Sequence, residues 1–203
     1  MFFSFDGLDG VGKTTQMQLF CQWLAEQKTE VVTCRDPGST PLGERIREIL
    51  LLSDEQTPIA ACSEMLLYMA ARAQLVDEII RPALEADKTV VSDRYLLANI
   101  VYQGHAGGLE PDAVRTVGQV ATGGILPDCT FLLDMSPKSA MRRMGDQLDR
   151  MESRGDGYRQ RLRDGFLAEA ERTDGAIHVI DADRPVDVVQ AELQAIATPL
   201  LAG

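Results

Sequence analysis

The stretch Gly7-Leu8-Asp9-Gly10-Val11-Gly12-Lys13-Thr14 fits the pattern G-x-x-x-x-G-K-[ST]. It follows the apolar run 2–5 and precedes a segment whose apolar residues recur at helical spacing. In this order of strand, loop and helix, backbone N–H groups of the glycine-rich loop converge on phosphate oxygens, and the positive end of the helix points at the same place. The sequence therefore predicts a P-loop that binds a nucleoside triphosphate.

Two side chains of this loop carry chemistry. Lys13 can bridge the terminal phosphates of ATP, and the hydroxyl of Thr14 can ligate Mg²⁺. The alternative, a glycine-rich turn followed by a chance Lys-Thr pair, is disfavoured by the flanking strand and helix patterns. We expect ATP to be held by six consecutive residues: Gly10, Val11, Gly12, Lys13, Thr14 and Thr15.

Length and composition limit the possibilities. A chain of 203 residues is expected to form one domain, 1–203, with a full hydrophobic core. Its net charge of −11 argues against a surface that coats nucleic acid or binds anionic membranes. No apolar run reaches the ~18–20 residues of a membrane span, and the start of the chain lacks the basic region of a signal peptide. The four cysteines show no metal-binding spacing, which predicts buried free thiols in a reducing cytoplasm.

Strand-like and helix-like segments alternate along the chain. Strands are predicted at 2–5, 31–34, 89–93, 131–134 and 177–180, and the second is expected to be buried. Helix starts are predicted at Thr40-Pro41, Thr57-Pro58 and Ser136-Pro137, a kink or restart at Pro82, and an amphipathic helix at 186–196. This alternation predicts an α/β fold with a five-stranded parallel sheet covered by helices on both faces.

Polar clusters follow the predicted strands, at the edge where an open parallel sheet binds its ligands. Besides the P-loop they are Arg35-Asp36-Pro37-Gly38-Ser39-Thr40 and Asp93-Arg94-Tyr95, which leads on to Asn99, Tyr102 and Gln103. A third, arginine-rich stretch at 142–154 has few core residues, which is typical of a surface loop that acts as a lid.

Six motifs in order carry a resemblance to a known family. They are GLDGVGKTTQ, RDPGSTPLGERIR, LYMAARAQL, SDRY with its following YQG, LDRME, and RQRLRDGF. The chain resembles bacterial thymidylate kinases over nearly its whole length. The resemblance implies a P-loop kinase fold with an arginine-rich lid at about 142–157. It also implies phosphoryl transfer from ATP to dTMP, giving dTDP, with Mg²⁺ as cofactor and a cytoplasmic homodimer formed through helices.

The expected chemistry needs cations rather than a general base. A phosphate monoester has a second pKa near 6, so the acceptor is mostly a dianion at neutral pH and is already a nucleophile. Catalysis then requires charge neutralisation and in-line positioning of two anions. The candidate site accordingly holds several arginines, and His105 and His178 are expected to be structural.

The resemblance implies a role for each phosphate-site residue. Arg94 would clamp the acceptor phosphate with help from Arg35 and from Arg47, although Arg47 fits a solvated helix charge equally well. Asp93 would hold Mg²⁺ together with Thr14. Asp9, a carboxylate among phosphate-binding amides, would accept a hydrogen bond from the 3′-hydroxyl of the sugar.

The resemblance also implies the nucleoside contacts. Tyr68 and Arg72 lie four residues apart, on one helix face. Tyr68 would stack on thymine, although core packing is an alternative, and Arg72 would donate to O4. Asn99 or Gln103 would pair with the N3 edge. Tyr102 would close off the 2′-carbon of the sugar.

The chain departs from the family pattern at several positions. Ala98 replaces a serine, Gly107 replaces a frequent arginine, and Gly145-Asp146 stands where Arg-Gly is common. Some members carry an arginine in the P-loop where this chain has Val11, so the charge that meets the transferring phosphoryl group must come from elsewhere. Among the lid arginines Arg142, Arg143, Arg150 and Arg154, the retained LDRME pattern favours Arg150, with Arg143 second.

Two other functions stay open at this level. One is a P-loop kinase of another pyrimidine nucleotide or of a nucleoside, which a panel of acceptor substrates would distinguish. The other is a nucleotide-gated switch, which would hydrolyse ATP slowly without an acceptor.

Overall fold

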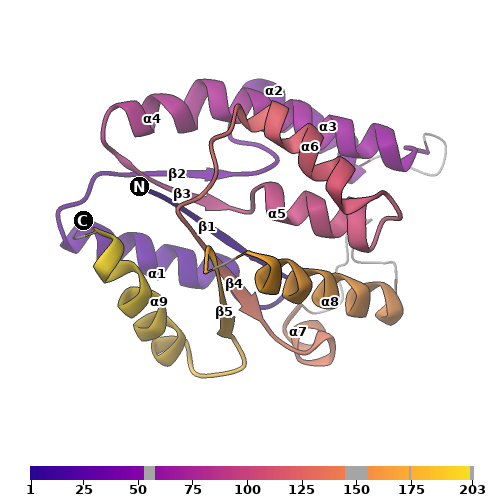
Figure 1. The fold of residues 1–203 in the computed structure, drawn as a ribbon. Helices are drawn as coiled ribbons and strands as arrows, with labels where there is room; N and C mark the ends of the chain where they lie inside the picture. The colour runs from indigo at the N-terminus through magenta and orange to yellow at the C-terminus, as the bar shows by residue number, and fades with distance from the viewer. Residues whose placement is uncertain (53–57, 145–154, 174, 202–203) are drawn as a thin grey trace.

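Five parallel strands form the centre of the molecule. The computed structural model describes residues 1–52, 58–144, 155–173 and 175–201. The strands lie in the order β2-β3-β1-β4-β5, and each neighbouring pair is parallel (Figure 1). Their bounds are β1 (Phe2–Gly7), β2 (Val31–Arg35), β3 (Thr89–Asp93), β4 (Cys129–Asp134) and β5 (Ile177–Asp181). The predicted parallel sheet and its five strands are confirmed, and β1 with its P-loop is the central strand.

Helices cover both faces of this sheet (Figure 1). Helices α1 (Lys13–Glu26) and α9 (Val186–Leu201) pack together on one face. The segments of the opposite side are α2 (Pro41–Leu52), α3 (Ala61–Leu75), η1 (Val76–Ile80), α4 (Arg81–Glu85), α5 (Leu96–Asn99), η2 (Ile100–His105), α6 (Pro111–Thr122) and α8 (Asp156–Arg172). The short helix α7 (Pro137–Met144) follows the carboxyl end of β4.

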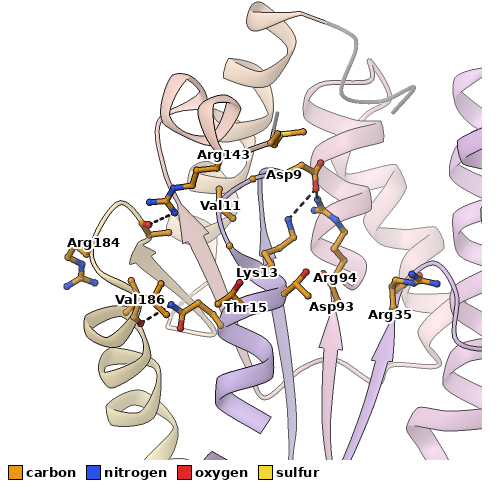
Figure 2. A pocket seen from close by; sticks show the side chains of 18 of the residues that line it. Asp9, Val11, Lys13, Thr15, Arg35, Asp93, Arg94, Arg143, Arg184 and Val186 are labelled. Carbon is orange, nitrogen blue, oxygen red and sulfur yellow. Dashed lines mark hydrogen bonds and ion pairs between the residues drawn. The ribbon is translucent and has the colours of Figure 1, made fainter. Parts of the chain in front are cut away.

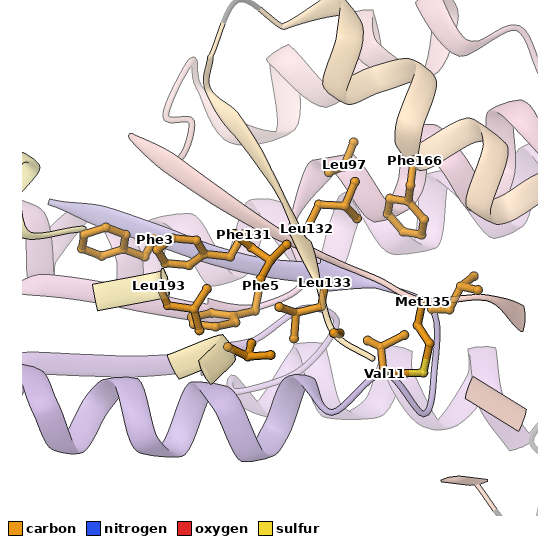
Figure 3. Close-up of a cluster of buried hydrophobic side chains, with 14 of the residues drawn as sticks. Phe3, Phe5, Val11, Leu97, Phe131, Leu132, Leu133, Met135, Phe166 and Leu193 are labelled. Atoms are coloured by element: carbon orange, nitrogen blue, oxygen red, sulfur yellow. The ribbon is translucent and has the colours of Figure 1, made fainter. Parts of the chain in front are cut away.

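The side chains of β1 point alternately to the two faces of the sheet, as the pleat of a strand requires. Phe3 and Phe5 are fully buried and pack edge-on against Phe20 of α1, with Phe131 of β4 beside them (Figure 3). Phe2 points to the other face, where its ring meets that of Tyr95. Each fully buried ring contributes roughly 1.5–3 kcal/mol relative to an exposed one. The near-continuous apolar run of β1 follows from this burial on both faces.

Two predicted helix starts are confirmed by their capping bonds. The hydroxyl of Thr40 accepts a hydrogen bond from the N–H of Gly43 at 2.9 Å, and that of Ser136 accepts one from Ser139 at 3.1 Å. Such bonds satisfy N–H groups that the first helical turn leaves without a partner. The third predicted start was wrong: α3 begins at Ala61, three residues after Pro58, and Thr57 lies outside the described residues.

Pro82 restarts the long helix, as predicted. The turn before it, η1, has π-helical geometry, and α4 begins at Arg81 with Pro82 in its first turn. Proline has no N–H and its ring clashes with the carbonyl four residues earlier, so the hydrogen-bond ladder must change there.

Several expectations about exposure were wrong. Strand β2 lies at one edge of the sheet, and only Cys34 of its five residues is buried, so it is not the buried strand predicted. Of the four cysteines expected to be buried, Cys62 is exposed and Cys21 is only partly buried. Among the described helices, none has the length and apolarity needed to cross a membrane.

Candidate active site

The carboxyl ends of β1, β2 and β3 surround a cavity of about 900 Å³ (Figure 2). The P-loop forms its floor, and Arg35, Asp93 and Arg94 line one side. The opposite end is formed by α7 and the turn from β5 into α9. Among the described residues that line it are six cationic and three acidic side chains, so the cavity suits an anion.

The P-loop has the backbone that the motif predicts. Gly10 and Gly12 have φ of +84° and +96°, which L side chains rarely adopt, and a Cβ at Gly10 would meet the carbonyl oxygen of Ala140 at 2.4 Å. Gly12 directly precedes α1, so the first N–H groups of that helix face the cavity. This geometry is the one that holds a triphosphate in P-loop proteins.

Lys13 is buried against its own loop. Its ammonium donates to the carbonyl oxygens of Leu8 at 2.8 Å and Gly7 at 3.2 Å, and lies 3.3 Å from Asp9. Burial lowers the pKa of Lys13, and the nearby Arg94 lowers it further. The ammonium is thus held at the floor of the cavity, where the terminal phosphates of ATP would lie (Figure 2).

The carboxylate of Asp9 contacts two cationic side chains of the site, Arg94 and Lys13. It accepts a hydrogen bond from Arg94 at 2.5 Å and contacts Lys13 (Figure 2). The hydroxyl of Tyr102 also donates to Asp9, at 3.0 Å. Burial alone would raise the pKa of Asp9, but Arg94 and Lys13 outweigh burial and hold that pKa well below its usual range. Asp9 is therefore a carboxylate at all physiological pH values, placed between the two cations expected to bind the donor and acceptor phosphates.

Arg94 stands on an unusual backbone. Its φ is +65°, a conformation uncommon for a residue other than glycine, and its N–H donates to the carbonyl oxygen of Phe5 while its own carbonyl accepts from Ser92. Its guanidinium donates to Gly7 and to Tyr102. Burial opposes the charge of Arg94, but Asp9 raises its pKa well above the ordinary value.

Beneath this cluster lies Asp6, which the sequence analysis did not select. Its side chain is fully buried, and neither carboxylate oxygen has a hydrogen-bond partner among the described residues. Burial raises the pKa of Asp6 to about 7, against the opposing effect of Arg94, whose guanidinium lies 3.7 Å away, and of Lys13. The signal available in the sequence was an acidic residue in a central strand whose other side chains are three phenylalanines and one serine.

A second cavity of about 110 Å³ opens beside the first, and both contain Asp9 and Arg94. It is lined by Tyr68 and Arg72 of α3, by Asn99, Tyr102 and Gln103, and by the apolar residues Pro37, Leu51 and Ala98. The residues expected to contact thymine and deoxyribose therefore share one cavity.

Arg72 is almost fully buried and is held by an ion pair that the sequence analysis missed. Its Nε donates to the carboxylate of Asp36 at 2.5 Å, and a further N–H donates to the carbonyl oxygen of Tyr95. Asp36, at the carboxyl end of β2, fixes the position of the guanidinium at the cavity wall.

Hydrogen bonds distinguish Asn99 from Gln103. The Nε2 of Gln103 donates to Glu64 at 3.0 Å, and its Oε1 accepts from the Nδ2 of Asn99 at 2.6 Å. The Oδ1 of Asn99 is buried and has no hydrogen-bond partner among the described residues. Asn99 thus has an acceptor oxygen available to a ligand, whereas both polar atoms of Gln103 already have partners.

Arg35 and Arg47 both line the large cavity, with different partners. Arg35 is exposed and forms two hydrogen bonds with the carboxylate of Glu44, whereas Arg47 is half-buried and donates to the carbonyl oxygen of Pro37 at 3.0 Å. Burial lowers the pKa of Arg47, and Arg35 adds to this effect. Arg47 is therefore more than a solvated helix charge.

The lid prediction is only partly covered by the structure. Arg150 and Arg154 lie outside the described residues, and 142–144 belong to α7 and 156–157 to α8 rather than to a loop. Arg142 is exposed. The guanidinium of Arg143 donates to the carbonyl oxygen of Ala182 and lies 3.4 Å from Asp183, at the end of the cavity away from Arg94 (Figure 2).

That end of the cavity includes further residues that the sequence analysis missed. They are Ala182, Arg184, Pro185, Val186 and Val189, and the side chain of Gln16 in α1 donates to the carbonyl oxygen of Val186. Arg143 and Arg184 flank this apolar stretch, an arrangement that suits a flat aromatic base at the far end of a triphosphate.

Thr14 and Asp93 can hold a magnesium ion between them. Both line the large cavity, and both also line the adjoining groove along α1 and β2. No cluster of three or more acidic, histidine or cysteine side chains suited to a metal occurs among the described residues. A hydroxyl and one carboxylate fit Mg²⁺, which takes most of its remaining ligands from water and substrate phosphates.

Comparison with known proteins gives one family. A family model described as thymidylate kinase matches residues 5–193. The chain is 40% identical over 202 residues to a thymidylate kinase of Symbiobacterium thermophilum, covering 99% of this chain and 94% of that protein. It is 42% identical to thymidylate kinases of Exiguobacterium sibiricum (95% and 91% covered) and Bifidobacterium longum (96% and 95% covered).

Proposed function

This chain belongs to the thymidylate kinase family, and on that premise we propose that it transfers a phosphoryl group from ATP to dTMP, giving dTDP and ADP. The observation that carries the proposal is the pair of joined cavities, which share Asp9 and Arg94. ATP occupies the large cavity over the P-loop, and dTMP occupies the small one. The acceptor phosphate then lies beside Arg94, facing the terminal phosphate of ATP.

The hydrogen-bonding pattern of the small cavity supports a thymine base. Arg72 can only donate, and the unpartnered Oδ1 of Asn99 can only accept. Thymine and uracil offer a matching acceptor at O4 and donor at N3, whereas cytosine offers the reverse. Of the two residues expected at N3, Asn99 is the one with an available acceptor. Tyr68, from the same cavity, stacks on the base.

The sugar is read by Asp9 and Tyr102. Asp9 accepts the 3′-hydroxyl, and its low pKa keeps it in the charged, accepting form. Tyr102 is 9% exposed and held in place by its bond to Asp9, so its ring is a rigid wall beside the 2′-carbon. Its bulk excludes ribonucleotides.

The reaction needs no general base, because the acceptor phosphate is mostly a dianion at neutral pH. Lys13 neutralises the donor phosphates, and Arg94 holds the acceptor phosphate, with Arg35 and Arg47 nearby. Thr14 and Asp93 would hold Mg²⁺, which would supply charge neutralisation on the donor side. Because Lys13 and Arg94 are fixed in place, they offset the repulsion between the two phosphate groups and align them for transfer.

We also propose that the chain acts as a cytoplasmic homodimer. Large apolar side chains are exposed on α2 (Leu42 and Ile49), α3 (Leu66) and α6 (Val120), and these three helices lie together on one side of the molecule (Figure 1). Leu42 and Ile49 are seven residues apart, so they lie on one face of α2. A second copy of the chain would cover these residues.

A coupled assay of ADP formation tests the proposal. With ATP fixed, dTMP, dUMP, dCMP and dAMP are compared with a reaction that lacks an acceptor. We expect fast turnover with dTMP, turnover with dUMP, and none with dCMP or dAMP. ADP formation that does not depend on the acceptor would instead indicate a nucleotide-gated switch, and a preference for dCMP would overturn the base assignment.

A further inference from the structure

The carboxyl group of Asp6 lies inside the protein, beneath the proposed phosphate site. Along β1, Phe3 and Phe5 pack against α1, so Asp6 points to the opposite face of the sheet, as Ser4 does. The side chain of Asp6 is fully buried and is not among those that line either substrate cavity. A bound substrate therefore cannot touch Asp6, and any effect of Asp6 on the reaction must act through a neighbouring side chain.

That neighbour is Arg94. The Nη1 of Arg94 lies 3.7 Å from the Oδ1 of Asp6 and donates to the carbonyl oxygen of Gly7 at 3.0 Å. Its Nη2 donates to Asp9 and to the hydroxyl of Tyr102. Within the part of the chain that the structure describes, Asp6 and Asp9 are the carboxylates that lie within 4.0 Å of this guanidinium. One of them contacts it from inside the protein and the other from the cavity.

The two carboxylates differ in what substrate binding does to them. Asp9 and Tyr102 line the proposed dTMP cavity, and Asp9 is proposed to accept the 3′-hydroxyl, so the sugar competes with Arg94 for this carboxylate. The acceptor phosphate also attracts the guanidinium toward the cavity. Asp6 is out of reach of the substrate and keeps its contact with the other side of the guanidinium. A guanidinium that is held in this way can bind the phosphate without moving toward it.

The charge of Asp6 opposes folding, which a residue with only a structural role would not require. Neither carboxylate oxygen has a hydrogen-bond partner among the described residues. Burial raises the pKa of Asp6 to about 7, although Arg94 and Lys13 both act to lower it. An uncharged side chain of the same shape would avoid this cost of burial. The presence of a carboxyl group here is explained if the neighbouring site uses its charge.

We propose that Asp6 is a positioning residue, which holds the guanidinium of Arg94 where it aligns the acceptor phosphate of dTMP for phosphoryl transfer. This inference rests on the proposed kinase function. Asp6 touches neither substrate and takes no part in making or breaking bonds. It limits the displacement of Arg94, and so the displacement of the acceptor phosphate from the line of transfer.

The test asks whether Asp6 acts through Arg94. Asp6→Asn keeps the shape of the side chain and removes its charge, and it is made both in the parent and in an Arg94→Gln background, which gives a double-mutant cycle. Ser4→Ala is the matched control, because Ser4 is buried on the same face of β1 but bonds to Thr130, which lies outside the site. All variants are first shown to be folded by thermal melts.

The kinetics are measured at pH 8, above the pKa of Asp6, so that the parent carries the charge. ATP and dTMP are both varied, and single-turnover reactions with enzyme in excess extend the range to slow variants. If Asp6→Asn does not fold, Asp6→Ser, which fits in the same space, replaces it in both backgrounds.

We expect Asp6→Asn to lower kcat about 10–100-fold in the parent, because a misplacement of about 1 Å at the reacting groups has an effect of that size. KM for ATP should change no more than a few-fold. In the Arg94→Gln background the same substitution should lower kcat less than about two-fold, since the side chain that Asp6 positions is absent. Ser4→Ala should match the parent within about two-fold. Asp6→Asn should also be at least as stable as the parent at this pH, so that unfolding cannot explain its lost activity.

A kcat of Asp6→Asn within about three-fold of the parent would overturn the proposal, whatever the KM values. So would an equal loss of kcat in the Arg94→Gln background, because the effect would then not depend on Arg94. An equal loss in Ser4→Ala would do the same, because it would show that any polar change on this face of β1 disturbs the site.

The parent enzyme separates this inference from the function on which it rests. If the parent fails to phosphorylate dTMP, the kinase assignment fails. If the parent is active and Asp6→Asn is equally active, only the role of Asp6 fails.

Discussion

Arg72 has two roles that can be tested separately. It lines the proposed dTMP cavity, and it forms a buried ion pair with Asp36. The guanidinium is 2% exposed and its partner Asp36 is fully buried. Removing one member of such a pair leaves an uncompensated charge and costs roughly 3–5 kcal/mol of stability. Any variant of Arg72 must therefore be compared with one that breaks the same pair but keeps the guanidinium.

The first prediction uses Arg72→Gln and Asp36→Asn. Loss of a hydrogen bond from a charged donor should raise KM for dTMP about 10–100-fold in Arg72→Gln, with much less effect on KM for ATP. Asp36→Asn should destabilise the fold to a similar degree but raise KM for dTMP less. Substrate kinetics and urea unfolding of both variants provide the check. Equal increases in the two KM values would mean that Arg72 is structural.

The second prediction concerns the wall beside the sugar. If the bulk of Tyr102 excludes the 2′-hydroxyl, Tyr102→Phe should retain most of the preference for dTMP over ribothymidylate, despite losing the bond to Asp9. Tyr102→Ala should relax that preference. The ratio of kcat/KM for the two nucleotides measures it, and an unrelaxed ratio in Tyr102→Ala would refute the steric explanation.

The third prediction follows from the buried carboxyl of Asp6. Its pKa is about 7 in the folded state and 3.8 when solvated, so between these values the folded state binds more protons than the unfolded state. The contribution of Asp6 to the free energy of unfolding must therefore decline as pH rises from about 4 to above 7.

The variant Asp6→Asn has no such titration. Relative to the parent it should gain stability between pH 5 and pH 8, by about 2.7 kcal/mol, because about two pH units of this interval lie below the folded-state pKa. Urea unfolding gives the free energy of unfolding of both proteins at pH 5 and at pH 8. The quantity to compare is the stability of Asp6→Asn minus that of the parent at each pH. A difference that is the same at both pH values would show that Asp6 is not protonated in the folded state.

At the scale of elements, the fourth prediction concerns the start of α2. Thr40 is buried and caps the helix through Gly43. Thr40→Ala should cost about 1 kcal/mol, within the range of 0.5–2 found for lost caps, whereas Thr40→Ser should cost much less because it keeps the hydroxyl. Thermal melts compare the two, and equal destabilisation would mean that the methyl group matters more than the cap.

The elements also show why some of the fold could be predicted and some could not. The strand 2–5, the P-loop and α1 have strong local signals: an apolar run, glycines at fixed spacing, then helical periodicity. Strand β2 has a similar apolar run, but its exposure depends on its position at the edge of the sheet. The residues of the strand alone do not determine that position. Helix α8 buries only a narrow apolar stripe, Tyr158, Leu162 and Phe166, within a charged segment, so its periodicity is weak.

The candidate site divides in the same way. Residues in motifs, such as Lys13, Arg94 and Arg72, could be selected from the sequence, and the structure brings them into adjoining cavities. The residues that hold site side chains in place were missed: Asp36 binds Arg72, 36 positions away in the chain, and Glu64 binds Gln103, 39 positions away. Such pairings are set by tertiary packing, for which a single sequence gives no pattern.

At the scale of the whole molecule, the fifth prediction tests the proposed dimer. Leu66→Glu, or Ile49→Glu, places a charge on the exposed apolar side of α3 or α2 and should convert a dimer to a monomer. Leu126→Glu is the matched control, because Leu126 is equally exposed but lies outside α2, α3 and α6. Analytical ultracentrifugation gives the masses. A parent that is already monomeric would contradict the proposal.

The cation-lined cavity has a consequence for the protein's surroundings. Six of the chain's 20 lysines and arginines line it, while the chain as a whole carries a charge of −11. The surface outside the cavity is therefore more acidic than the average of the chain. RNA, DNA and other large polyanions are far more abundant in a cell than a single mononucleotide, and an exposed basic patch would collect them. Here a long polyanion meets repulsion wherever it extends beyond the cavity, whereas a mononucleotide fits entirely inside.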